Sequence, residues 1–144
     1  MYDDVMPLEE QGSKDRSRVL VVEDDQSVRR MLRFSLKSAG FEIFEVATGG
    51  DALQALNQDA PEAVILDLGL PDGLGGSVLE WLRQSEGGGL VWVVISAQDQ
   101  TDLVNRYGPL GRHFLVKPFD PWELVSRIQE LMATQARHHI GKRP

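Results

Sequence analysis

The 144-residue chain contains no cysteine, which excludes disulfide bonds and metal sites built from thiolates. It also lacks an apolar run near the roughly 20 residues that a membrane-spanning helix needs. Its amino-terminus is acidic, without the basic and then apolar order of a secretory signal peptide. We therefore expect a cytoplasmic protein without membrane contact. The lack of cysteine is compatible with a reducing compartment.

Positive charge is scarce outside the carboxyl-terminal end. The formal net charge is -7, with 22 Asp and Glu against 15 Lys and Arg. An acidic body disfavours direct binding to nucleic acid, whose phosphates require a basic surface. A protein partner or a cation suits this chain better.

The length suits one domain, and the chain divides into three segments. Residues 1–16 carry many charges and no sustained apolar period, which is typical of a flexible leader. Residues 17–133 hold the whole pattern of strands and helices. Residues 134–144 form a basic carboxyl-terminal tail, which we expect to be frayed from Arg137 onward.

Short runs rich in Val, Ile, Leu and Phe alternate with segments whose apolar residues recur every three or four positions. The runs predict strands and the segments predict helices. This alternation predicts an α/β fold with a parallel sheet and right-handed crossovers. The expected strands are 18–22, 41–46, 63–67, 90–96 and 114–116, and the expected helices contain residues 26–39, 52–56, 78–82, 101–107 and 120–132.

The helix before the last strand is expected to be short or irregular. Only residues 101–107 are available to it, because Gly108, Pro109 and Gly111 interrupt the pattern that follows.

Polar and charged side chains stand where the expected strands end. Asp67 ends an apolar strand, Glu23 and Asp24 follow the first strand, and Ser96 and Lys117 close the last two. Because parallel strands bring their carboxyl ends to one edge of the sheet, we expect these five side chains to lie together. Crowded carboxylates repel one another, so they must share protons or be neutralised by a cation and a base.

Mg²⁺ is the natural cation for this set, since it prefers oxygen ligands and keeps waters that an incoming phosphate can displace. Lys117 adds a point charge, and the Ser96 hydroxyl can donate to a phosphoryl oxygen. The set favours phosphoryl transfer to Asp67 by in-line attack of its carboxylate. The labile acyl phosphate could draw Ser96 and Lys117 toward itself, as in a switch.

Each of these residues also has an ordinary structural explanation. Asp24 or Asp25 could cap the first helix, and Asp67 the turn after its strand. Lys117 alone could be a solvated charge and Ser96 alone a turn residue. Their joint placement at one sheet edge favours the site.

Four ordered segments carry a similarity to a known family. They are Val21-Val22-Glu23-Asp24, Leu66-Asp67 with Leu70-Pro71-Asp72-Gly73, Ile95-Ser96-Ala97, and Leu115-Val116-Lys117-Pro118-Phe119. This set resembles the receiver domain of two-component response regulators over about residues 17–133. The resemblance implies a doubly wound, flavodoxin-like sheet of five parallel strands in the order 2-1-3-4-5.

The resemblance also implies roles for the acidic residues. Asp67 matches the phospho-acceptor, and Glu23 and Asp24 match the acidic pair that holds Mg²⁺. The backbone carbonyl of Gly69 is implied as a further metal ligand. Gly69 and Gln98 match variable positions that tune the lifetime of the phosphoryl group.

Further roles are implied on the last two strands. Ser96 matches the switch hydroxyl, Lys117 the phosphate-binding lysine, and Phe114 the aromatic residue that changes rotamer on activation. A cis peptide bond is implied between Lys117 and Pro118.

The chain departs from the family pattern before the last strand. Receivers of this type usually have Gly-Ala-Asp-Asp-aromatic there, whereas this chain has Gly111-Arg112-His113-Phe114, one residue fewer. The departure adjoins the short helix, which in the family forms the output face together with the fifth strand and the last helix.

We expect a phospho-accepting signalling domain that catalyses only its own phosphorylation and dephosphorylation. The resemblance implies a sensor histidine kinase or a phosphotransfer protein as donor, a downstream protein or an output domain as target, and homodimers on phosphorylation. The alternatives are a receiver-like binding module that phosphate does not switch and a fragment of a longer DNA-binding regulator.

Two further functions are disfavoured by particular residues. An aspartyl-phosphate hydrolase usually has a second Asp as its acid, where this chain has Gly69. A flavin carrier needs a loop that cradles phosphate after the first strand, where Glu23, Asp24 and Asp25 repel it.

Overall fold

The computed structural model describes residues 16–85 and 88–141. The strands are β1 (Arg18–Val22), β2 (Glu42–Val46), β3 (Ala63–Asp67), β4 (Val91–Ser96) and β5 (Phe114–Val116). The helices are α2 (Gln26–Ser38), α3 (Gly49–Gln58), α4 (Gly75–Gln84), α5 (Gln100–Tyr107) and α6 (Pro121–Gly141). The expected leader lies outside the described residues, apart from Arg16.

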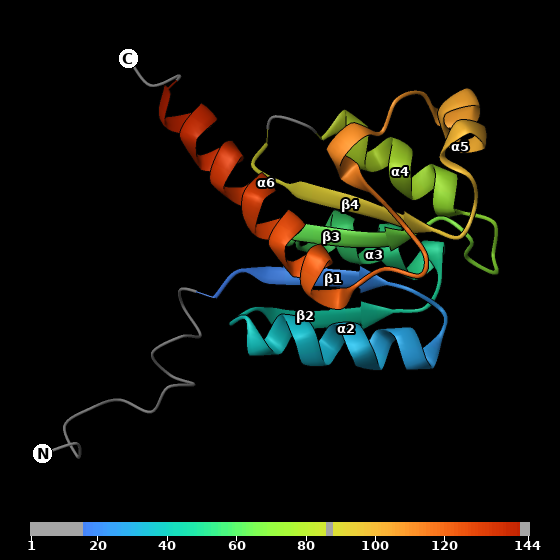
Figure 1. Ribbon diagram of the computed structural model, residues 1–144, viewed down its shortest axis with the longest axis horizontal. Coiled ribbons are helices and arrows are strands. Elements are labelled where there is room, and N and C mark those ends of the chain that lie inside the picture. Colours follow the sequence, from blue (N-terminus) through green and yellow to red (C-terminus); the bar gives the residue numbers. More distant parts are fainter. Residues whose placement is uncertain (1–15, 86–87, 142–144) are drawn as a thin grey trace, which may run out of the picture.

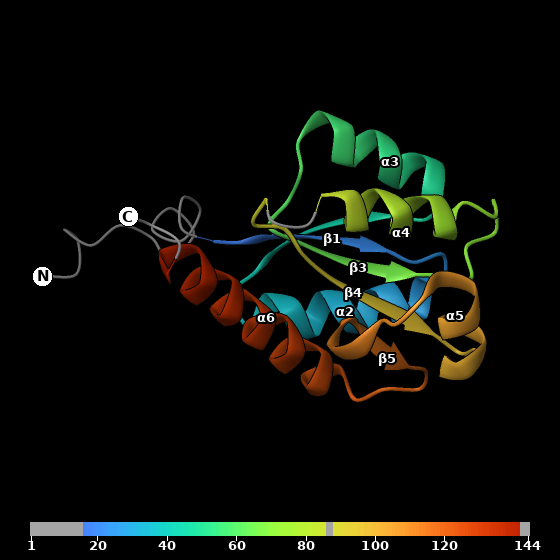
Figure 2. The same cartoon turned by 90° about the horizontal axis from the view of Figure 1, so that it is seen from above.

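The strands form one parallel sheet in the order β2-β1-β3-β4-β5, which confirms the predicted topology (Figure 1). Helices α3 and α4 cover one face of the sheet, and α2 and α6 cover the other (Figure 2). All carboxyl ends of the strands therefore meet at one edge, where the connecting loops carry the candidate site.

The two faces of the sheet are packed into two separate cores because successive strand residues point to opposite sides. Leu20, Val64 and Val94 belong to the core under α3 and α4. Val21 and Ile65 belong to the core under α2 and α6. Strand β3 is buried along its whole length, as its uninterrupted apolar run predicts, whereas β2 is a half-exposed edge strand.

Helix α5 is short, as expected. It has eight residues, and the residue that follows it, Gly108, has a φ of 85°, which favours glycine. A 3₁₀ turn at Gly111–His113 then leads into β5. Arg83 on α4 holds this end of the helix, because its guanidinium donates to the carbonyl oxygens of Tyr107 and Pro109, the second at 3.0 Å. The carboxyl end of α5 is thereby tied to α4.

Helix α6 begins as predicted, with Asp120 accepting a hydrogen bond from the amide of Trp122 at 2.9 Å and Pro121 as its first residue. It then continues to Gly141, so the expectation of a frayed chain from Arg137 was wrong up to that residue. The chain before Gly141 contains good helix formers, Ala133, Gln135 and Ala136, and no proline interrupts the helix beyond its buried stripe. Within the described ranges, no helix combines the length and apolar character that a transmembrane segment requires.

Candidate functional site

Three carboxylates meet at the carboxyl ends of β1 and β3. Glu23, Asp24 and Asp67 each place a carboxylate oxygen within 4.8 Å of the others. Glu23 and Asp67 are buried, whereas Asp24 is exposed, so the cluster opens to solvent on one side. Hard oxygen donors of this kind fit Mg²⁺ better than a soft metal, and the described residues add no thiolate or imidazole to this group.

The turn between β1 and α2 separates the two roles that Asp24 and Asp25 could have had. The Asp25 carboxylate caps α2 by accepting from the amides of Ser27 at 2.8 Å and Val28 at 3.2 Å. Asp24 therefore stays available to the cluster. The Asp25 amide donates to the Glu23 carboxylate at 3.1 Å, which fixes the buried acid.

Lys117 bridges two of the carboxylates from the end of β5. Its Nζ donates to Oε1 of Glu23 at 2.8 Å and to Oδ2 of Asp67 at 3.2 Å. Its own amide donates to the Ser96 carbonyl at 2.8 Å, and the peptide bond to Pro118 is cis, as expected. The ammonium group of Lys117 thus places a positive charge inside the acidic cluster, as the sequence predicts.

The charges of this cluster depend on burial and pairing. Burial raises the pKa of Glu23 to about 7, against hydrogen bonds from Lys117 and the Asp25 amide that favour its charged form. Burial alone would lower the pKa of Lys117, but its hydrogen bonds and charge pairing with Glu23 and Asp67 outweigh this and raise it. The buried glutamate is therefore the group that changes charge near neutral pH.

The loop after β3 folds back on the carboxylate of Asp67. The Gly69 amide donates to Oδ1 of Asp67 at 3.0 Å, and the Leu68 amide donates to the Ile95 carbonyl on β4. The backbone of Gly69 consequently lies beside the carboxylate.

The two residues that the resemblance assigns to switching lie at the end of β4 and the start of β5. Ser96 is buried, and its Oγ accepts from the Gln98 amide at 3.0 Å, so the hydroxyl proton remains free to be donated. Phe114 is buried in the core under α3 and α4, together with Trp92 and Leu103. Among the hydrogen bonds of the described residues, those within the cluster join Lys117 to Glu23 and Asp67, whereas the Ser96 hydroxyl contacts the Gln98 amide.

Two residues near the site escape detection in the sequence. Arg29 on α2 donates to the backbone carbonyls of Glu23 and Asp24. Asp72 accepts from the amides of Gly49 at 3.2 Å and Gly50 at 2.9 Å, so it caps α3 from the β3–α4 loop. Both act on backbone groups that every residue possesses, and no spacing of side chains signals such contacts.

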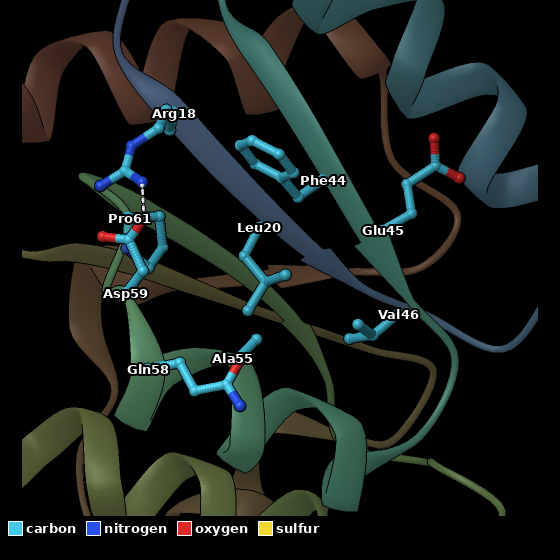
Figure 3. A pocket seen from close by; sticks show the side chains of 9 residues that line it. All are labelled: Arg18, Leu20, Phe44, Glu45, Val46, Ala55, Gln58, Asp59 and Pro61. Carbon is cyan, nitrogen blue, oxygen red and sulfur yellow. Dashed lines mark hydrogen bonds and ion pairs between the residues drawn. The ribbon is translucent and has the colours of Figure 1, made fainter.

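A separate groove of about 350 Å³ lies on the α3 side of the sheet edge formed by β2 (Figure 3). Phe44 and Leu20 line it with apolar surface, and its cation Arg18 is paired with Asp59 at 2.7 Å. None of the clustered acids lines this groove, so it is not part of the candidate site.

Comparison with known proteins gives consistent matches. The family described as response regulator receiver domain matches residues 19–129. The chain is 34% identical over 116 residues to the transcriptional regulatory protein GltR of Pseudomonas aeruginosa, covering 79% of this chain and 48% of that protein. It is 36% identical over 114 residues to the DNA-binding response regulator MtrA of Mycolicibacterium smegmatis, covering 79% of this chain and 50% of that protein.

A solved structure agrees with these matches. The signal receiver domain of a protein assigned as a Luxo repressor from Vibrio parahaemolyticus superposes with a TM-score of 0.76 at 31% identity. The superposition covers 90% of this chain and 99% of that domain. The chain spans about half the length of the curated relatives it matches.

Proposed function

The chain belongs to the receiver domain family of two-component response regulators, and from this membership we propose that Asp67 accepts a phosphoryl group from a histidine kinase or a phosphotransfer protein. The observation that carries the proposal is the placement of Lys117 between Glu23 and Asp67. This arrangement keeps a cation where the charge of a transferring phosphoryl group would develop.

The protein groups that the proposed transfer needs are already positioned in the site. A carboxylate oxygen of Asp67 forms a bond to phosphorus while the bond from phosphorus to the donor breaks, and the donor leaves with that electron pair. The Gly69 amide orients one oxygen of Asp67, and Lys117 stabilises negative charge on the phosphoryl oxygens. The product is an aspartyl phosphate.

Glu23, Asp24 and Asp67 would hold Mg²⁺ through their carboxylates, and Gly69 through its carbonyl. The ion would neutralise the acids and the arriving phosphate. The three carboxylates within reach of one another support this assignment.

The response to phosphorylation would pass through β4 and β5. A phosphoryl oxygen on Asp67 can accept the free proton of Ser96 and draw the charge of Lys117. Phe114 lies two positions before Val116 on β5, and its side chain would change rotamer with this movement. Gly69, which leaves the space beside Asp67 open, and the side chain of Gln98 would tune how readily water removes the phosphoryl group.

The output would reach a protein partner or an output domain through α5, β5 and α6. Val116 and Trp122 expose apolar surface there, 51% and 50% of their residue areas. The relatives include DNA-binding response regulators, which supports a receiver that belongs to a longer regulator. Phosphorylation would also favour homodimers through this face, and the domain would work in the cytoplasm.

The proposal is tested by incubation with acetyl phosphate and Mg²⁺, followed by intact-protein mass spectrometry. We expect the mass of one added phosphoryl group on the wild type and none on Asp67→Asn. Asp59→Asn, which replaces an exposed acid that precedes β3 and pairs with Arg18, should still be modified. A wild-type chain that takes no phosphoryl group from acetyl phosphate or from a histidine kinase would contradict the proposal.

A further inference from the structure

Helix α2 carries an arginine that reaches back over the acidic turn after β1. Nη1 of Arg29 donates to the carbonyl oxygen of Glu23 at 2.8 Å and to that of Asp24 at 3.0 Å. These two carbonyls belong to the consecutive residues whose carboxylates enter the acidic cluster. The guanidinium therefore binds the turn by its backbone and leaves the carboxylates free.

The guanidinium of Arg29 is itself held from the other side. Oε1 of Glu45 on β2 lies 3.4 Å from Nε of Arg29, and both side chains are only 20% exposed. Arg33, one turn further along α2, also donates to Glu45, and this hydrogen bond is the main cause that lowers the pKa of the glutamate. Glu45 thus stays charged at neutral pH and fixes Arg29 between β2 and the turn.

The remaining contacts of the turn show what Arg29 adds. The amide of Glu23 donates to the Val46 carbonyl, and the cap at Asp25 holds the start of α2. Among the hydrogen bonds of the described residues, the carbonyls of Glu23 and Asp24 are bound by Arg29. Without this contact, the peptide groups that orient the two acids could rotate.

We propose that Arg29 is a positioning residue that presents the carboxylates of Glu23 and Asp24 to a divalent cation. The inference rests on the proposed function, since it requires a cation at the acidic cluster. Groups that orient metal ligands from outside the coordination sphere commonly change metal affinity by about 10- to 100-fold. Here the oriented group is the backbone of two neighbouring ligands.

Charge and position predict opposite effects for Arg29. A positive guanidinium beside the turn repels a divalent cation, so its removal would tighten cation binding if charge alone mattered. Loss of the two carbonyl contacts would instead loosen the ligands and weaken binding. The direction of the change in affinity therefore decides between the two.

The test measures binding of Mg²⁺ alone by isothermal titration calorimetry on the full chain. We expect Arg29→Gln to raise the dissociation constant about tenfold, the lower end of the usual range. Arg29→Lys keeps the charge and a donor but loses the planar fork, so its loss of affinity should be smaller. At saturating Mg²⁺, Arg29→Gln should regain the wild-type rate of phosphorylation by acetyl phosphate.

Arg33→Gln is the matched control. Arg33 shares the helix and the partner Glu45 with Arg29, but in the described residues its guanidinium contacts Glu45 and not the turn. Its Mg²⁺ affinity should stay at the wild-type value. Thermal unfolding in a chelator should show that both variants remain folded, which separates a local loss of position from loss of the fold.

Unchanged or tighter Mg²⁺ binding by Arg29→Gln would overturn the inference, as would an equal loss in Arg33→Gln. In either case the wild type would still bind Mg²⁺ and accept the phosphoryl group, so the proposed function would stand. A wild type that binds no Mg²⁺ and accepts no phosphoryl group would overturn both.

Discussion

At the scale of single residues, the site combines side chains that the sequence reveals with contacts that it hides. Asp67, Glu23 and Lys117 are recognisable because each ends a strand, and parallel strands share one edge. Arg29 and Asp72 are not, because they bind carbonyls and amides whose positions depend on the folded turns. A charged residue on a helix gives no sign of which backbone group it will meet.

The raised pKa of Glu23 makes stability depend on pH. Its pKa is about 7 in the folded chain against an ordinary value of 4.5, so between these values the folded state binds more protons than the unfolded state. When a chelator removes Mg²⁺, the contribution of Glu23 to the free energy of unfolding should therefore fall as the pH rises from 4.5 to about 7. Urea unfolding at a series of pH values measures it.

Glu23→Gln removes the titrating group and should remove this fall. Glu80→Gln, which replaces an exposed glutamate on α4, should leave it in place. An equal fall in the wild type and Glu23→Gln would show that Glu23 is not its source.

At the scale of elements, the strands agree with the sequence better than the helix ends do. A strand buried on both faces is marked by its apolar run, so β3 and β4 could be bounded within a residue. The end of α6 could not, because helix propensity without burial continues the helix beyond the last core residue. The start of α3 is capped locally by Thr48 and also by Asp72, a residue from another loop.

The cap that Asp72 provides ties the β3–α4 loop to α3. Its carboxylate accepts amides of α3, chiefly that of Gly50, and these bonds lower its pKa. Asp72→Ala should lower the thermal midpoint by a few degrees, because the first amides of α3 lose their acceptor. Asp51→Ala, within the first turn of α3, should cost less, and an equal loss would contradict the cross-loop cap.

At the scale of the whole molecule, the sheet order places acids from β1 and β3 and a lysine from β5 at one edge. Strand and helix alternation predicted the shared edge, whereas the order of the strands was implied by the resemblance to receiver domains. The burial of each charged side chain did not follow from the alternation of strands and helices, since Glu23 is buried and its neighbour Asp24 is exposed. Binding at such an edge should stabilise the entire fold, because the acids come from separate strands.

Mg²⁺ in about hundredfold excess over its dissociation constant should add about 2.7 kcal/mol to the free energy of unfolding. Asp24→Asn should lose most of this gain, because it removes an exposed carboxylate of the cluster. Asp25→Asn is the control, since asparagine also caps a helix and the cluster keeps its acids. Urea unfolding with and without Mg²⁺ measures both, and an equal gain in Asp24→Asn would contradict the assignment.

The tie between Arg83 and the end of α5 determines how that helix can move. The carbonyls of Tyr107 and Pro109 are fastened to α4, while the opposite end begins just after Gln98. Because these hydrogen bonds hold the carboxyl end of α5, we expect any displacement of the helix to be smaller at Tyr107 than at Gln100, the end that follows the loop from Ser96.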